Sequence, residues 1–287
     1  MENNHKVIKM QHNHQYSIDD ILGGKRFRSN AKDSKGNYIG IAVALQQALD
    51  YVNPDGIVAT MPELIAAKIK ADSSHHFWQS WYCLHTEENI GIDKKGNFYN
   101  RNEPVLVIVN GGGILTPNRI RQAYNEGLIN NSAGYRNAEF DGLLEERLPN
   151  EDSIHLYRFE EIKNGVSNLP HRFGVVMPYK MAQETKSGYH NKKLFMDNPL
   201  VIARVAVMEH LEPYYERAKD PDKDIANYHP FEGRQPYPPQ GRLLFLNDYN
   251  YLDMHGYCGL HFYGYFVGVA PGQAGRACQK SSPTCRG

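Results

Sequence analysis

The segment 105–124, VLVIVNGGGILTPNRIRQAY, constrains the fold most, because a strand pattern, three glycines and a helix start follow one another without a break. Residues 105–109 are consecutive apolar β-formers, which is typical of a buried strand. The glycines occupy positions 111–113, and Thr116 and Pro117 suit the N-cap and first position of a helix. A strand that turns directly into a helix predicts a layered domain containing both elements.

The glycines also indicate an anion site. Glycine lets the backbone approach a ligand closely, and successive N–H groups ahead of a helix form a concavity that favours negative charge. We therefore expect Gly111, Gly112, Gly113 and Thr116 to bind a phosphate group. A tight strand-to-helix turn without a ligand explains the same residues equally well.

Known phosphate-binding motifs match this loop poorly. A Walker loop requires lysine after its last glycine, where this chain has Ile114. The dinucleotide pattern G-x-G-x-x-G lacks its third glycine, because Thr116 stands there, and Glu160 comes too late to be the ribose-binding acid. A standard dinucleotide-binding fold is therefore not expected.

Arg204 lies in PLVIARVAVM, a segment that is apolar around a whole helix, so part of its side chain must be buried. A buried cation requires a partner. The favoured interpretation is a structural ion pair, and the functional one is an anchor for phosphate or carboxylate. His190 and His229, in polar loops, are the candidates for general acid or base.

Two metal-site hypotheses are weaker. Glu161 and Lys163 form an E-x-K that, with Asp141 or Asp152 upstream, resembles the magnesium site of restriction-type nucleases. The sequence EEIKNG reads equally well as a charged exit from a strand.

A zinc site in HHFWQSWYCLHTEE would take its ligands from His75, His76, Cys83, His85, Glu87 and Glu88. On a strand, Cys83 and His85 would share one face. The spacing lacks the paired regularity of zinc motifs, and packing of aromatic residues explains the stretch better. We therefore expect no bound metal.

Three helix starts follow from capping signals: Ser17, for a short helix that stops at Gly23, the capping box of Thr60 with Glu63, and Thr116, whose helix should end near Gly127. A strand is expected from Phe77 to His85, and Pro213 should kink or end the helix that begins at Pro199.

Helix patterns cover residues 39–52 and 60–72, and strands and helices mix beyond them. The predicted fold is α/β or α+β, with a mixed β-sheet, flanking helices and a helical N-terminal region. We expect a polar arm at 1–38, one domain at 39–270 and a disordered tail at 271–287.

Charge and hydropathy narrow the class of protein. Lysine plus arginine equals aspartate plus glutamate, at 32 each, so no global field attracts nucleic acid, although a local groove is not excluded. The basic stretch 24–38 reads as a solvated loop or as a strap over an anion. No apolar run is long enough for a membrane span or signal peptide, which predicts a cytoplasmic protein.

These observations favour a hydrolase or transferase acting on a phosphate-bearing small molecule such as a nucleotide. A non-catalytic binding or assembly protein is the main alternative, because nineteen tyrosines and a proline-rich loop suit an interface. A metal-dependent nuclease is the third. The sequence does not indicate which cofactor, if any, the protein binds, or its oligomeric state.

Overall fold

The computed structural model describes residues 16–28, 34–36, 40–218, 225–247, 253–256, 259–261 and 264–270. Within these ranges a nine-stranded mixed sheet and a separate three-stranded sheet are combined with ten α-helices. The predicted mixed sheet with flanking helices is confirmed. None of the described helices is long and apolar enough to cross a lipid bilayer.

Along the chain, most helices alternate with strands and do not form one continuous helical segment. Their bounds are α1 Ile18–Leu22, α2 Gly40–Val52, α3 Met61–Lys70, α4 Pro117–Glu126, α5 Asn137–Leu144, α6 Phe159–Lys163, α7 Tyr179–Gln183, α8 Lys192–Met196, α9 Pro199–Val205 and α10 Met208–Ala218, with a 3₁₀ turn at His76–Trp78. The strands are β1 Lys25–Arg28, β2 Ile57–Val58, β3 Tyr82–Asp93, β4 Glu103–Asn110, β5 Ala133–Gly134, β6 His155–Arg158, β7 Phe173–Pro178, β8 Gly188–His190, β9 Ile225–Tyr228, β10 Gln240–Asn247, β11 Asp253–His255 and β12 Tyr265–Val269.

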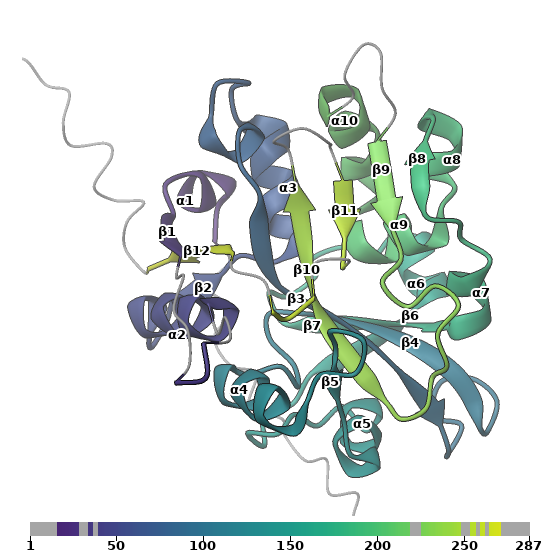
Figure 1. Ribbon diagram of the computed structural model, residues 1–287. Helices are drawn as coiled ribbons and strands as arrows, with labels where there is room; N and C mark the ends of the chain where they lie inside the picture. Colours follow the sequence, from purple (N-terminus) through teal and green to yellow (C-terminus); the bar gives the residue numbers. More distant parts are fainter. Residues whose placement is uncertain are drawn as a thin grey trace, which may run out of the picture.

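The large sheet runs in the order β6-β7-β4-β3-β10-β11-β9-β8, and β5 pairs with β10 (Figure 1). Its centre is antiparallel, from β7 through β4 and β3 to β10. Two pairs, β6 with β7 and β11 with β9, are parallel. The long strands β3 and β4 therefore lie in the middle, where both faces of the sheet can be covered.

Alternation along β4 divides the interior into two cores. Leu106 and Ile108 belong to the core under α1, α3, α9 and α10, whereas Val105, Val107 and Val109 belong to the core under α2, α4 and α5. This is the period of two that a pleated strand imposes. Because both faces are buried, β4 reads as one continuous apolar run.

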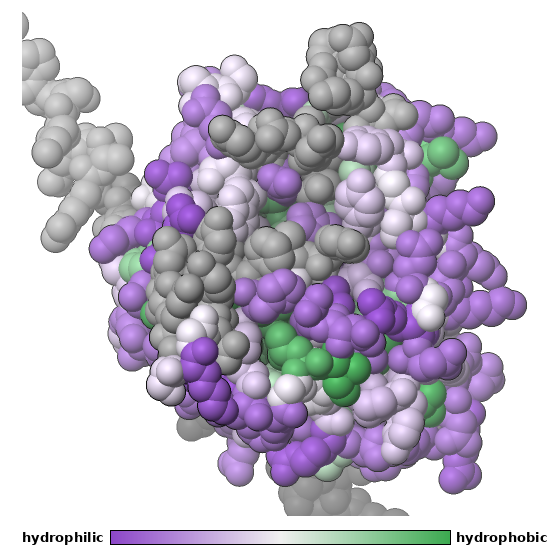
Figure 2. Space-filling model, in the orientation of Figure 1, coloured by the Kyte–Doolittle hydropathy of each residue, from purple (hydrophilic) through white to green (hydrophobic). Residues whose placement is uncertain are grey.

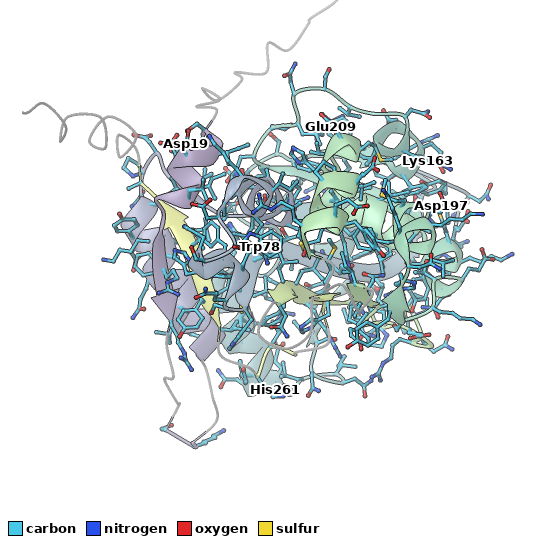
Figure 3. All side chains as sticks on the ribbon, turned by 90° about the horizontal axis from the view of Figure 1, so that it is seen from above. Asp19, Trp78, Lys163, Asp197, Glu209 and His261 are labelled. Carbon is cyan, nitrogen blue, oxygen red and sulfur yellow. The ribbon has the colours of Figure 1, made fainter. Side chains whose placement is uncertain are left out.

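Figure 3 shows the molecule from above, with α3, α9 and α10 gathered on one side of the large sheet. The three-stranded sheet β1-β12-β2 stands at the edge, next to α2. Lys25–Arg28 lies within the segment predicted as a polar arm, yet it pairs in register with β12. Residues 1–15 of that arm and the tail 271–287 lie outside the described residues.

The helix starts expected from capping signals are confirmed. Ser17 caps α1 in a capping box with Asp20, and Thr60 and Glu63 form the expected box at α3. At α4, Thr116 accepts a hydrogen bond from the N–H of Arg119, and the helix ends before Gly127 as expected.

Two element boundaries differ from the pattern. A strand was expected from Phe77, but residues 76–78 form a 3₁₀ turn and β3 begins at Tyr82. Pro213 was expected to end or kink the helix that starts at Pro199. Instead, Ala206 adopts a left-handed conformation with φ 58° and ends α9, and Pro213 lies inside α10.

Candidate functional site

The glycine loop, residues 111–113, lies above a buried carboxylate of the chain itself. The N–H groups of Ile114 and Leu115, which follow the glycines, donate to the two carboxylate oxygens of Glu87 at 2.8 Å each. Gly111 donates to the carbonyl of His85 at 2.9 Å. The N–H groups expected to bind a phosphate are therefore occupied by a carboxyl group of the protein itself, from β3.

Close packing explains why glycine occupies these positions. A Cβ at Gly113 would stand 2.2 Å from Oε1 of Glu87, and one at Gly112 would stand 2.7 Å from the His85 ring. Gly111 and Gly112 also have positive φ, of 79° and 92°. Burial raises the pKa of the Glu87 carboxyl to about 7, although the two backbone hydrogen bonds and one from Asn89 oppose that rise.

Arg204 makes an ion pair with the neighbouring glutamate. Its Nε donates to Oε1 of Glu88 at 2.7 Å, and both side chains are fully buried. Its other nitrogens donate to the side chain of Asn227 and to the carbonyls of Met254 and Tyr228. Arg204 thus joins α9 to β3, β9 and β11, which is the structural ion pair that the sequence favoured.

The two histidines lie far along the sheet from the glycine loop. His190 ends β8 and His229 follows β9, whereas the loop follows β4, and β3, β10 and β11 lie between. Burial lowers the pKa of His229 to about 3, with a smaller contribution from Arg204. The described structure does not bring these histidines and the loop together as the acid–base site of the sequence hypothesis requires.

The E-x-K residues are also dispersed. Glu161 and Lys163 lie on a helix, α6, instead of the end of a strand, and Lys163 is at the outer surface in Figure 3. Asp152 pairs with Arg172 at 2.6 Å and Asp141 faces Lys94. Among the described residues, no three acidic, histidine or cysteine side chains are placed to hold a metal ion.

A different group of residues comes together where the small sheet meets the large one. Along β1, Arg28 lies opposite Tyr265 of β12. The guanidinium of Arg28 lies 4.9 Å from the centre of the Tyr265 ring and donates to its hydroxyl at 2.6 Å. Arg26 lies 5.7 Å from the same ring, and Lys25 lies 5.1 Å from the ring of Tyr51.

Trp81 links these residues to the centre of the large sheet. Its ring is 6.0 Å from that of Tyr265 and 6.3 Å from that of Phe245 on β10. Phe245 in turn stacks on His255 of β11 at 5.5 Å. We call the outer part of this arrangement the aromatic–basic surface: Arg26, Arg28, Trp81 and Tyr265. Lys25 lies on the opposite face of β1, against Phe27 and Tyr51.

The two cations of the aromatic–basic surface are exposed and its two rings are half-buried. The sequence does not predict this surface, because its basic residues are typical of a loop and its aromatic residues are typical of core packing. The sequence signal for this surface is the alternation in KRFR, residues 25–28, where Phe27 is half-buried. Because successive side chains of a β-strand point to opposite faces, Arg26 and Arg28 lie on the face opposite Phe27.

No family model matches the chain, and no curated protein matches it. A solved structure from Nanoarchaeota, described as accommodation of massive sequence variation by the C-type lectin fold, is similar with a TM-score of 0.63. The similarity covers 86% of this chain and 97% of the other, at 24% identity. This finding overturns the expected hydrolase or transferase and the nuclease alternative. The chain has the C-type lectin fold.

Proposed function

We propose that the protein is a non-catalytic binding protein and that it recognises a protein partner through the aromatic–basic surface. The observation that carries the proposal is the similarity to a C-type lectin fold described as accommodating massive sequence variation. A fold that tolerates variation needs a scaffold held by buried contacts and a surface that does not determine folding. Buried pairs such as Arg204 with Glu88 supply the first requirement here.

The chemistry of the surface supports recognition of a protein. Tryptophan, tyrosine and arginine are the residue types that carry most of the binding energy in protein interfaces. Trp81, Tyr265 and Arg28 provide all three, with the Tyr265 ring in contact with both of the others. Arg26 adds positive charge to that of Arg28, so the partner's surface is acidic where it meets them.

The surrounding sequence has a matching composition. Tyr249, Tyr251, Tyr257 and Tyr263 precede Tyr265, interspersed with asparagine, glycine and histidine. Tyrosine with small polar residues is the composition of antibody-like binding surfaces, because it provides large contact area with adaptable hydrogen bonding. Figure 2 shows a mostly hydrophilic face, with apolar side chains gathered over β5 and the lower end of β10.

A protein array tests the proposal. Purified wild type and the double variant Arg28→Ala/Trp81→Ala are applied to the same array, with Arg121→Ala on α4 as a control outside the surface. We expect partners of the wild type to bind the double variant at least tenfold more weakly and the control unchanged. Partners that bind all three proteins equally contradict the assignment of the surface.

Salt dependence provides a second readout. If the cations meet acidic groups, affinity falls as ionic strength rises, because exposed charges are screened. The double variant, which has lost one of these cations, has a shallower dependence.

A further inference from the structure

A second site lies between α1, α3, α10 and the loop before β7. A cavity of about 350 Å³ opens there, which is within the size range of small-molecule sites. Its apolar walls include Ile18, Ile21, Leu169, Phe173 and Val207. None of these five belongs to the aromatic–basic surface, so the cavity is a separate feature of the molecule.

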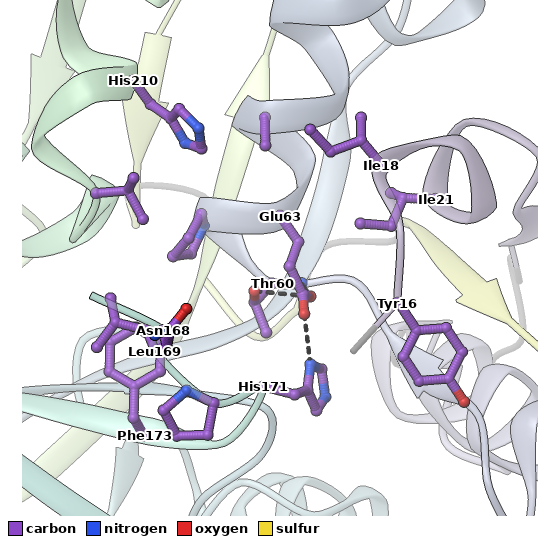
Figure 4. A pocket seen from close by; sticks show the side chains of 14 residues that line it. Tyr16, Ile18, Ile21, Thr60, Glu63, Asn168, Leu169, His171, Phe173 and His210 are labelled. Atoms are coloured by element: carbon purple, nitrogen blue, oxygen red, sulfur yellow. Dashed lines mark hydrogen bonds and ion pairs between the residues drawn. The ribbon is translucent and has the colours of Figure 1, made fainter. Parts of the chain in front are cut away.

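Glu63, Thr60 and His171 lie together on one side of the cavity (Figure 4). Nδ1 of His171 lies 2.7 Å from Oε1 of Glu63, and because a carboxylate has no proton to give, the ring nitrogen is the donor. Oε2 of Glu63 accepts from the backbone N–H and the hydroxyl of Thr60, at 2.9 and 2.8 Å. Oε1 therefore has one remaining acceptor site, and the Glu63 side chain is 21% exposed.

The Glu63 carboxylate carries a negative charge, and the His171 ring beside it adds a positive charge only when it is protonated. Burial alone would raise the pKa of Glu63, but the charge and hydrogen bond of His171, with the hydrogen bonds of Thr60, lower it overall. Glu63 is therefore ionised at neutral pH. No lysine or arginine is among the described residues that line the cavity.

His210 faces the carboxylate from the other side of the cavity. Its ring points from α10 toward the space in Figure 4, and burial lowers its pKa, so it is neutral at pH 7. Within the described residues, its buried Nδ1 has no hydrogen-bond partner. A buried nitrogen without a partner is costly, and a bound ligand offering a polar hydrogen or acceptor would satisfy it.

We propose that this cavity binds a small organic cation, a protonated amine on an apolar body, with the ammonium at Oε1 of Glu63 and the apolar body against Phe173 and the aliphatic wall. The rings of Phe173 and Tyr16 line the same space and favour a cation. The Glu63 carboxylate repels an anion at this position. A neutral molecule gains the apolar contacts but no charge-assisted hydrogen bond.

Three probes of similar shape test the charge preference. 2-Phenylethylamine, 2-phenylethanol and phenylacetate are titrated separately into the full chain and followed by ligand-observed NMR. We expect the amine to bind at least tenfold more tightly than the alcohol or the acid. Equal affinities, or no binding of the amine, overturn the proposal.

Matched variants locate the site. Glu63→Gln retains a residue able to form the capping box and removes the charge, so the amine should lose its advantage over the alcohol. Glu161→Gln is the control, because Glu161 holds the same capping position at α6 and does not line the cavity. An amine preference that survives Glu63→Gln, or disappears in Glu161→Gln, contradicts the assignment.

Filling the cavity gives an independent check. Val207→Phe should weaken all three probes at least tenfold, and thermal unfolding shows whether the variant is folded. If it is not, Ala66→Leu fills the cavity from α3 instead. A folded filled variant that binds the amine like the wild type overturns the location.

Discussion

Two adjacent glutamates attach opposite layers of the protein to the same strand. Because successive side chains of β3 point to opposite faces, Glu87 receives the loop after β4 and Glu88 receives Arg204 of α9. The sequence identified the glycines and Arg204 as unusual. It could not show that their partners are neighbouring acids, because each contact joins residues far apart along the chain.

The packing at Gly113 predicts a large effect of one methyl group. Gly113→Ala places a Cβ against the Glu87 carboxylate in a closed interior, so we expect a loss of about 3 kcal/mol in the free energy of unfolding. Gly142→Ala, in α5, meets no atom closer than 3.6 Å and should gain about 0.5–1 kcal/mol. Urea denaturation measures both. Similar values for the two variants would contradict this explanation of the loop.

The Glu87 carboxyl predicts a pH dependence. Its pKa is about 7 in the fold against the ordinary 4.5, so the folded state binds more protons between these values and stability falls as pH rises from about 4.5 to 7. The upper limit of this contribution is about 3 kcal/mol. Denaturation from pH 5 to 8 should show the decline in the wild type and a smaller one in Glu87→Gln. Parallel profiles would show that Glu87 is not responsible.

Breaking the buried ion pair of Arg204 with Glu88 should lower the free energy of unfolding more than breaking an exposed pair. Arg204→Met leaves Glu88 charged and unpaired in the core, which should cost about 3–5 kcal/mol. Lys94→Ala removes a cation that faces Asp141 at 3.9 Å at the surface and should cost less than about 1 kcal/mol. Chemical denaturation compares the two. A loss below 1 kcal/mol for Arg204→Met would mean that this pair does not hold α9 to the sheet.

At the scale of elements, local signals predicted helices well and the central strand poorly. The starts of α1, α3 and α4 follow from caps within three or four residues. Strand β3 continues through Thr86, Glu87, Glu88 and Asn89, which are buried polar residues. Sequence patterns assign such residues to turns, because their partners come from other elements.

The break between α9 and α10 gives a prediction at this scale. Ala206 ends α9 with φ 58°, a conformation that alanine adopts at a cost and glycine does not. We expect Ala206→Gly to raise the free energy of unfolding by about 0.5–1 kcal/mol. Ala203→Gly, inside α9, should lower it by about 1 kcal/mol. Thermal unfolding distinguishes the signs, and a loss in both would argue against a left-handed residue at 206.

At the scale of the whole molecule, the class of fold was predictable and its topology was not. Alternating helices and strands indicate a mixed sheet. The order of that sheet places β10 beside β3 and β9 beside β11, through contacts that no local pattern encodes. The candidate surface was missed for the same reason, because Arg28, Trp81 and Tyr265 meet only after three distant segments pair.

The central claim is that the aromatic–basic surface serves binding while the polar residues of the core serve folding. Two display libraries test it directly. One randomises the four residues of the surface, and the other randomises four buried residues, Glu87, Glu88, Arg204 and Gly113. Both are selected for resistance to protease and then for binding to one fixed protein, lysozyme.

We predict that most members of the surface library resist protease, as the unaltered protein does, and that this library produces binders. Most members of the core library should be digested, since they lose buried pairs or close packing. If the surface library is digested as readily as the core library, or produces no binder from its folded members, the account is contradicted.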